Sequence, residues 1–340
     1  MLPDLSTTCG EIDDLTLLSR ERLVYLSADE LTKVSSVADY RVMSPLVEVR
    51  RFLHCNYNCY DVDRLEQFYV AVFGLRVVMR SDSDGGEASP FGIYGLPAVS
   101  RASFVYDHRG GRRASSLELV QWIQPATIGS VYPEPWNRGI QSAAFSSADL
   151  HATTELAVSL GATVVRQSDD WLLLTDPEGV SVEVLRADGP TEARYLRIVC
   201  SNLETTTAWW KQIGFTESPL TTVDGSEIWP GDDTHHITAE RCLVATDDPT
   251  FGIVLTTWSG AVPIGPTYGM PYHQGLYRSA MAVDDIDAAF ATLTEAGVSL
   301  QSPYTFQLPG TKLVNGLKMM FIRDPDGILI EFVERPRQPN

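Results

Sequence analysis

The chain has 340 residues, of which 44% are hydrophobic and 21% are charged, as in an ordinary soluble protein long enough for two domains. Its formal net charge of −18 argues against nucleic acid or an anionic membrane as a partner. The five cysteines include no C-x-x-C pair, so neither a disulfide framework nor a zinc finger is indicated. The acidic start, MLPDLSTTCGEIDD, is unlike a signal peptide, and we expect a cytoplasmic protein.

Residues 1–44 form an N-terminal extension with helical stretches such as SADELTKV. Residues 54–75, HCNYNCYDVDRLEQFYVAVFGL, predict a strand and then an amphipathic helix that ends near Gly74. The same order of strand, helix and glycine stop recurs from residues 139, 195 and 276. Stretches that alternate like strands follow each helix. The chain therefore predicts four units of strand, helix and about three strands, which is an α+β class with curved, antiparallel-rich sheets.

The sequence also repeats over a longer period. Residues 128–149 align without a gap on residues 264–285, at an offset of 136. The repeat divides the chain into two halves of one design, residues 45–187 and 193–335.

Two copies of a short motif close these halves. Residues 175–185 read TDPEGVSVEVL and residues 323–333 read RDPDGILIEFV. Asp-Pro-x-Gly favours a type I turn, and the strand that follows carries Glu183 or Glu331 between apolar neighbours. A buried carboxylate is costly unless it is paired or bound to a metal. The duplication therefore indicates two carboxylates with a structural or chemical role.

The strand and helix of residues 54–75 and the two Asp-Pro-x-Gly endings resemble the vicinal oxygen chelate superfamily. This superfamily includes glyoxalase I, bleomycin and fosfomycin resistance proteins, methylmalonyl-CoA epimerase and extradiol dioxygenases. The resemblance covers nearly everything after residue 44. It implies four βαβββ modules that form two glyoxalase-like curved-sheet domains. In this family two modules pair to form a cup around one divalent metal, and each module can supply one ligand from its first strand and one from its last.

The resemblance assigns the ligand positions module by module. In chain order they are His54 and Glu118, Ser142 and Glu183, Tyr195 and Val254, and Arg278 and Glu331. The ungapped repeat of the long connector favours pairing of consecutive modules, which predicts a metal site of His54, Glu118 and Glu183 in residues 45–187 and a degenerate site in residues 193–335. If modules one and four pair instead, Glu331 replaces Glu183 and Arg278 faces the site. One imidazole and two carboxylates suit Zn, Mn, Fe, Co or Ni.

Polar side chains also line the predicted cup. Asn56 and Asn58 share a strand face with His54, and with Ser142 they form a neutral surface predicted to bind substrate hydroxyls. Glu118 and Glu183 are the candidate catalytic groups, since a carboxylate at the metal can remove and return a proton beside a ketone.

We therefore predict a metal-dependent epimerase or isomerase that acts on a small polyhydroxylated ketone. The resemblance suggests an epimerase of secondary metabolism, such as antibiotic biosynthesis, that acts on the cyclitol 2-epi-5-epi-valiolone. One alternative is an extradiol, catechol-cleaving dioxygenase, and another is a non-catalytic, drug-binding resistance protein. We expect a monomer or a homodimer.

Overall fold

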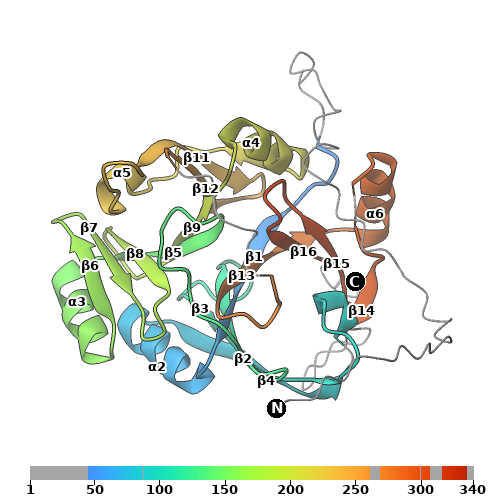
Figure 1. Ribbon diagram of the computed structural model, residues 1–340, viewed down its shortest axis with the longest axis horizontal. Helices are drawn as coiled ribbons and strands as arrows, with labels where there is room; N and C mark the ends of the chain where they lie inside the picture. The colour runs from blue at the N-terminus through green and yellow to red at the C-terminus, as the bar shows by residue number, and fades with distance from the viewer. Residues whose placement is uncertain (1–44, 87, 261–268, 299, 307–315, 335–340) are drawn as a thin grey trace, which may run out of the picture. The chain divides into compact units, whose positions relative to one another are not determined.

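The computed structural model describes residues 45–86, 88–260, 269–298, 300–306 and 316–334, so the predicted extension of residues 1–44 lies outside the described residues. The described chain is an α+β protein built around two eight-stranded mixed sheets that are curled (Figure 1). The predicted class and the four modules of strand, helix and three strands are confirmed. None of the described helices is long and apolar enough to cross a membrane.

Modules one and two make up the first half of the chain. Their elements are β1 (Arg51–Cys59), α2 (Val62–Phe73), β2 (Arg76–Gly86), the short 3-10 helix η1 (Ser89–Phe91), β3 (Ala98–Tyr106), β4 (Ser116–Gln124), β5 (Gly139–Ser147), α3 (Leu150–Ser159), β6 (Thr163–Gln167), β7 (Trp171–Thr175) and β8 (Ser181–Arg186).

Modules three and four make up the second half. Their elements are β9 (Ala193–Val199), α4 (Leu203–Gln212), β10 (Phe215–Glu217), α5 (Gly225–Ile228), β11 (Ile237–Ala245), β12 (Asp248–Trp258), β13 (Gly275–Val283), α6 (Ile286–Glu295), β14 (Tyr304–Phe306), β15 (Leu317–Arg323) and β16 (Leu329–Glu334).

The four long helices begin with the same local chemistry. Asp61, Asp149, Asn202 and Asp285 are the N-caps, and each side chain accepts a hydrogen bond from the backbone N–H three residues later. This cap fixes the end of each preceding strand. The residues seven positions before the caps, where the family places its first-strand ligand, therefore occupy equivalent places in the four modules.

The sheets do not pair module one with module two, or module three with module four. The first sheet has the order β14-β15-β16-β13-β1-β4-β3-β2 and joins modules one and four, whereas the second has the order β10-β11-β12-β9-β5-β8-β7-β6 and joins modules two and three. Strands β1 and β13 lie side by side (Figure 1). They run antiparallel, with Asn56 opposite Arg278. The pairing favoured by the sequence is thus wrong and its alternative is confirmed. The repeat identified equivalent modules, but it carries no information on which strand edges meet.

Aromatic packing connects modules one and two across the two sheets. Phe73 of α2 stacks on Phe145 of β5 with ring centroids 4.6 Å apart, and Tyr69 lies 6.0 Å from the same ring. All three side chains are at most 2% exposed. Burial of one such ring contributes roughly 2–3 kcal/mol, so this cluster holds modules one and two together although no strand of one pairs with a strand of the other.

The two Asp-Pro-x-Gly turns also connect consecutive modules. Asp176 accepts hydrogen bonds from the hydroxyls of Tyr57 (3.1 Å) and Tyr69 (2.9 Å) of module one. In the second copy, Asp326 accepts from the Ser201 backbone N–H (2.9 Å) and the Thr206 hydroxyl (3.0 Å) of module three. The turn of modules two and four therefore docks on the preceding module, which explains why the motif occurs twice.

Asp324 opens the second of these turns and is buried with one carboxylate oxygen unused. Its Oδ1 accepts from the backbone N–H groups of Asp326 and Ile328, and its Oδ2 has no hydrogen-bond partner. Burial, together with the neighbouring charge of Asp326, raises the pKa of Asp324 from its ordinary 3.8 to about 8. Between these two pKa values the folded protein therefore keeps Asp324 protonated, whereas the unfolded chain releases this proton.

The D324N variant should gain stability relative to the wild type as the pH rises. Because the pKa of Asp324 is raised in the folded state, its protonation contributes to the stability of the wild type fully below pH 3.8. This contribution is lost as the pH rises toward 8. Urea unfolding at about pH 5 and about pH 9 should show the variant's advantage growing by about 1 to 3 kcal/mol. D285N, at the exposed N-cap of α6, is the control. An advantage for D324N that is the same at both pH values would contradict this account.

Candidate active site

Three of the residues at predicted ligand positions, His54, Glu118 and Glu331, come together in the first sheet. The first cup is the curled face that carries His54, Asn56, Glu118, Arg278 and Glu331. Asn56 lies opposite Glu118 in the parallel pair β1–β4, and Ala280 lies opposite Glu331 in the parallel pair β13–β16. Two modules therefore each contribute a carboxylate from their last strand, as the ligand pattern requires for modules one and four.

His54 points its Nε2 atom at both carboxylates. This atom lies 3.4 Å from Glu118 Oε2 and 3.9 Å from Glu331 Oε2. It is buried and has no hydrogen-bond partner, while Phe104 packs edge-on against the imidazole at 5.3 Å. A buried imidazole nitrogen without a partner is costly. We therefore expect this nitrogen to bind a further group.

Arg278 lies in the first cup at the position of the fourth ligand. Its Nη2 donates to Glu118 Oε2 (2.7 Å) and its Nε donates to Glu331 Oε2 (2.8 Å). Burial alone would lower the pKa of Arg278, but the two carboxylates outweigh this effect and raise it. The guanidinium is therefore a permanent positive charge in direct contact with both acidic groups.

The donor set fits a divalent cation. Two ligand atoms bound tetrahedrally at about 2.1 Å from one ion lie about 3.4 Å apart. The distance from His54 Nε2 to Glu118 Oε2, 3.4 Å, matches this value, and the distance to Glu331 Oε2, 3.9 Å, is longer. In the described chain no three His, Cys, Asp or Glu side chains are arranged so that they could hold a metal ion as they stand, and both carboxylates here accept hydrogen bonds from Arg278. The cation and the guanidinium would thus use the same oxygen atoms.

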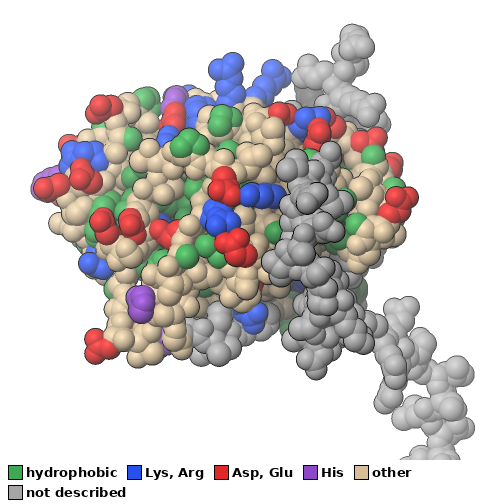
Figure 2. Space-filling model, turned by 90° about the horizontal axis from the view of Figure 1, so that it is seen from above, with side chains coloured by type: hydrophobic (Ala, Val, Ile, Leu, Met, Phe, Trp, Pro, Cys, Tyr) green, Lys and Arg blue, Asp and Glu red, His purple; other side chains and the backbone are tan. Residues whose placement is uncertain are grey.

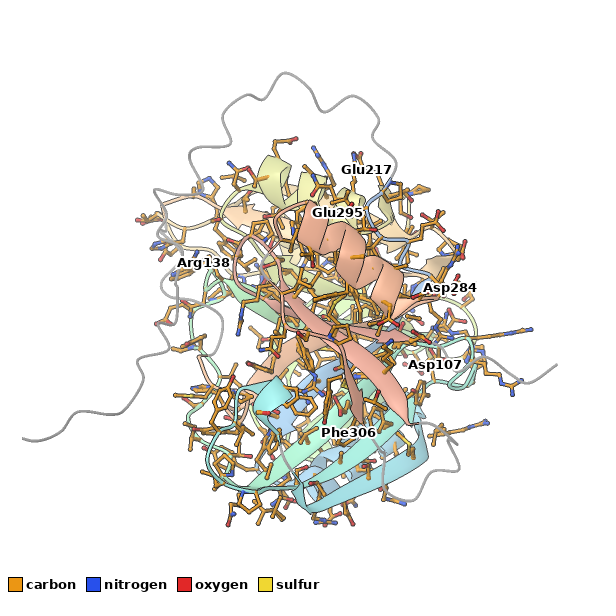
Figure 3. All side chains as sticks on the ribbon, turned by 90° about the vertical axis from the view of Figure 1, so that its right-hand side faces the viewer. Asp107, Arg138, Glu217, Asp284, Glu295 and Phe306 are labelled. Atoms are coloured by element: carbon orange, nitrogen blue, oxygen red, sulfur yellow. The ribbon has the colours of Figure 1, made fainter. Side chains whose placement is uncertain are left out.

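Aromatic side chains cover the guanidinium. The Arg278 guanidinium lies 5.2 Å from the ring centroid of Phe91, a cation–π contact. Phe91 in turn contacts Phe321 at 5.3 Å and Phe306 of β14 at 6.3 Å between ring centroids (Phe306 is labelled in Figure 3). With Phe104 beside His54, these rings give the polar cluster an apolar border that lowers the local dielectric.

Glu183 does not lie in the first cup, so the predicted set of His54, Glu118 and Glu183 is wrong. The second cup is the face of the second sheet that carries Ser142, Glu183, Tyr195 and Arg197. Its Glu183 is 0% exposed and accepts hydrogen bonds from Ser142, Tyr195, Arg197 and the Trp229 indole at 2.6 to 3.0 Å.

The charged groups of the second cup are all paired with one another. Burial alone would raise the pKa of Glu183, but the Arg197 guanidinium and the surrounding hydrogen bonds hold it below its usual value. Arg197 also contacts Glu240 and donates to the Val223 carbonyl (2.9 Å), while Glu240 accepts from the backbone N–H of Gly225 at the start of α5 (2.7 Å). Both oxygens of Glu183 are used, and the remaining ligand position is the apolar Val254. This cup thus has no free donor set for a metal.

The three polar groups predicted to bind substrate lie in different environments. Asn58 donates to the Pro271 and His273 carbonyls and accepts from the Trp122 indole, so its amide is fully used. Ser142 donates to Glu183 in the second cup. Asn56 donates to Glu118 Oε2 at 3.3 Å, and its Oδ1 has no hydrogen-bond partner. Only Asn56 therefore combines a place beside the carboxylates with an unused acceptor.

The sequence reasoning missed Arg197, Trp229 and Phe91. Arg197 lies two residues after Tyr195, the ligand position of module three, and so shares its strand face. The alternation of side chains along the strand could therefore have predicted that Arg197 lies in this site. Trp229 and Phe91 come from segments outside the repeated strands, and nothing in the repeat marks them.

The surface outside the cups carries charges of both signs. Asp and Glu side chains are interspersed with Lys and Arg on the face shown in Figure 2. Exposed ion pairs such as Arg101–Asp63 and Arg80–Glu66 belong to this surface. Such exposed pairs contribute little to stability, unlike the buried pairs of the two cups.

Comparisons with known proteins agree with the module structure. Residues 54–185 match the glyoxalase-like domain family, and residues 193–332 match the Glyoxalase/Bleomycin resistance protein/Dioxygenase superfamily. No curated protein matches the chain. Glyoxalase I from Zea mays has a similar structure, with a TM-score of 0.55, 17% identity, and coverage of 84% of this chain and 92% of that chain.

A second solved structure has the same fold. It is a "putative dioxygenase" from Bacillus subtilis, with a TM-score of 0.56, 13% identity, and coverage of 85% of this chain and 86% of that chain. At these identities the two solved structures show the fold alone.

The two duplicated glutamates should respond in opposite ways to substitution. E183Q should leave metal binding unchanged but destabilise the protein by about 3 kcal/mol, because it leaves the Arg197 charge without its buried partner. E331Q should weaken metal binding instead. Metal titration and urea unfolding of both variants provide the test. Loss of metal from E183Q, with E331Q unaffected, would show that the wrong cup has been assigned.

Proposed function

Because the chain belongs to the glyoxalase/bleomycin resistance/dioxygenase superfamily, we propose that it is a metal-dependent isomerase or epimerase. The reaction moves a proton at the carbon beside a ketone that carries a neighbouring hydroxyl. The single observation that supports this most is the approach of His54 Nε2 to Glu118 and Glu331. It gives the first cup the ligands of one divalent cation and a carboxylate that can act as a base.

His54, Glu118 and Glu331 would hold the cation. Zn, Mn, Fe, Co and Ni all accept this mixture of one nitrogen and two carboxylate ligands. When bound, such a cation supplies a Lewis acid that stabilises negative charge on a ketone oxygen. The remaining steps depend on the protein's own side chains.

Glu118 is the better of the two carboxylates for moving the proton. Its side chain is 11% exposed, whereas that of Glu331 is 4% exposed, so Glu118 is the more accessible of the two. Asn56 and Arg278 donate to its Oε2, which orients the carboxylate and leaves Oε1 for the proton. Return of the proton to the neighbouring carbon gives an isomerase, and return to the same carbon on the opposite face gives an epimerase.

The apolar border supports proton transfer by excluding water. Phe104 packs on His54, and Phe91 covers Arg278. Such surroundings limit the access of water to the carboxylate and to a bound substrate. This border also keeps solvent from protonating the substrate at random.

The cyclitol substrate loses part of its support. That suggestion rested in part on three neutral polar groups, and of these only Asn56 lies beside the carboxylates with an unused acceptor. We therefore propose a substrate with a ketone and an adjacent hydroxyl, and 2-epi-5-epi-valiolone is one member of that class.

A ring-cleaving dioxygenase fits the first cup less well. Oxygen-activating iron sites of that kind use two histidines and one carboxylate, and His54 is the histidine that faces Glu118 and Glu331 in the described chain. A binder without catalysis would need neither the unpartnered imidazole nitrogen nor two buried carboxylates. Proton transfer is the chemistry that uses all three groups.

The H54A variant should lose its metal while keeping its fold. Removing the nitrogen ligand should lower the affinity for Mn²⁺ by at least about 100-fold, and the circular dichroism spectrum should stay unchanged. H151A, at an exposed position on α3, is the matched control and should bind Mn²⁺ as the wild type does. Normal Mn²⁺ affinity in H54A would exclude His54 as a ligand.

The proposed reaction should label its substrate in D₂O. With a panel of small α-hydroxyketones, the Mn²⁺-loaded protein should exchange the hydrogen beside the ketone for deuterium, as followed by NMR. E118Q should slow this exchange by about 10²- to 10⁴-fold, whereas E155Q, at an exposed position of α3, should not. Exchange that continues at the wild-type rate in E118Q would rule out Glu118 as the base.

A further inference from the structure

Arg278 uses the oxygen atoms that a cation would need. Its two hydrogen bonds end on Glu118 Oε2 and Glu331 Oε2, and these are the atoms that face His54 Nε2. The imidazole nitrogen, by contrast, has no hydrogen-bond partner. The guanidinium therefore satisfies the acidic part of the site and leaves the nitrogen ligand unsatisfied.

We propose that Arg278 and the divalent cation compete for Glu118 and Glu331, and that the displaced guanidinium binds a carboxylate of the substrate. This inference rests on the proposed function and names the substrate class: a molecule whose ketone and hydroxyl oxygens lie next to a carboxylate. Arg278 is thus a specificity-determining residue as well as the internal partner of the acidic pair.

The charge of the cup supports a substrate with one negative charge. The two carboxylates and the guanidinium sum to −1, and His54 is neutral when it acts as a ligand. A divalent cation changes this sum to +1. Since the side chains are largely buried, an excess positive charge is costly there. A monoanionic substrate restores neutrality, whereas a neutral polyol does not.

The geometry keeps the displaced guanidinium within the cup. Arg278 is 5% exposed, it lies opposite Asn56 in the β1–β13 pair, and the Phe91 ring covers its guanidinium. A buried guanidinium that loses two carboxylates needs another anion, and a cation–π contact is too weak to replace them. The fork of the guanidinium matches a carboxylate with two parallel hydrogen bonds.

The second cup shows the permanent form of the same arrangement. There Arg197 is 0% exposed and is bonded to Glu183, Glu240 and the Val223 carbonyl. Tyr195, at the position equivalent to His54, donates its hydroxyl to the same glutamate, so no ligand is left over. The first cup differs because His54 Nε2 has no hydrogen-bond partner. A cation can therefore exchange with the guanidinium there, as proposed.

Titration of the full-length protein with Mn²⁺ tests the competition without any turnover. In the absence of anions, R278M should bind Mn²⁺ at least about tenfold more tightly than the wild type, because no guanidinium opposes the ion. R278K keeps one charge but not the fork, and its affinity should fall between the two. R80M, which removes an exposed arginine paired with Glu66, is the matched control. Unchanged or weaker binding by both Arg278 variants would overturn the competition.

Thermal unfolding provides a second readout if R278M folds poorly. Without metal its two carboxylates repel each other, so its Tm should fall below that of the wild type, and Mn²⁺ should restore it. A Tm that Mn²⁺ fails to raise more in R278M or R278K than in the wild type would also contradict the proposal.

Two small probes test the substrate class. Pyruvate carries a ketone beside a carboxylate, and hydroxyacetone has a neutral hydroxyl in its place. Pyruvate should tighten Mn²⁺ binding to the wild type at least about fivefold more than hydroxyacetone does, and this difference should vanish in R278M. Equal effects of the two probes on the wild type would exclude a carboxylate partner for Arg278.

These outcomes separate the two proposals. A wild-type protein that binds no Mn²⁺ at any concentration would end the proposed metal-dependent function. Mn²⁺ binding that is the same with and without the Arg278 guanidinium would end only the inference about Arg278.

Discussion

The antiparallel pairing of β1 with β13 is the interaction on which the first cup depends. It joins the opening strands of modules one and four and places Asn56 opposite Arg278. The parallel partners of these two strands, β4 and β16, then bring Glu118 and Glu331 to the same cluster. Without this one pairing, His54 would face a different set of side chains. The chemistry of the cup is therefore a consequence of which sheet edges meet.

The same carboxylate has two different environments in the two sheets. In the second cup Glu183 is surrounded by donors, and an internal guanidinium balances its charge permanently. In the first cup Glu331 shares its guanidinium with Glu118, and the imidazole nitrogen has no partner. A duplicated strand thus gives a structural ion pair in one sheet and, in our proposal, a cation-binding set in the other. The difference comes from neighbouring strands, not from the motif.

Much of the molecule could be read from the sequence, and the failures have physical causes. Caps such as Asp61 and Asp285 and the alternation of the strands are local signals, so the modules and the positions of His54, Glu118 and Glu331 were predictable. The pairing of modules was not, because equivalent strands such as β1 and β5 have similar edges and the choice between them is made by tertiary packing. Arg197 was not predicted as a site residue because it lies two residues after the ligand position Tyr195 and reaches the site only through its long side chain.

Anomalous diffraction from a crystal grown with Mn²⁺ tests the central claim most directly. We expect one peak bordered by His54 Nε2 and by carboxylate oxygens of Glu118 and Glu331, with the Arg278 guanidinium turned away from both. A peak beside Glu183 in the second cup, or two carboxylates still bonded to Arg278 with no peak between them, would contradict the account.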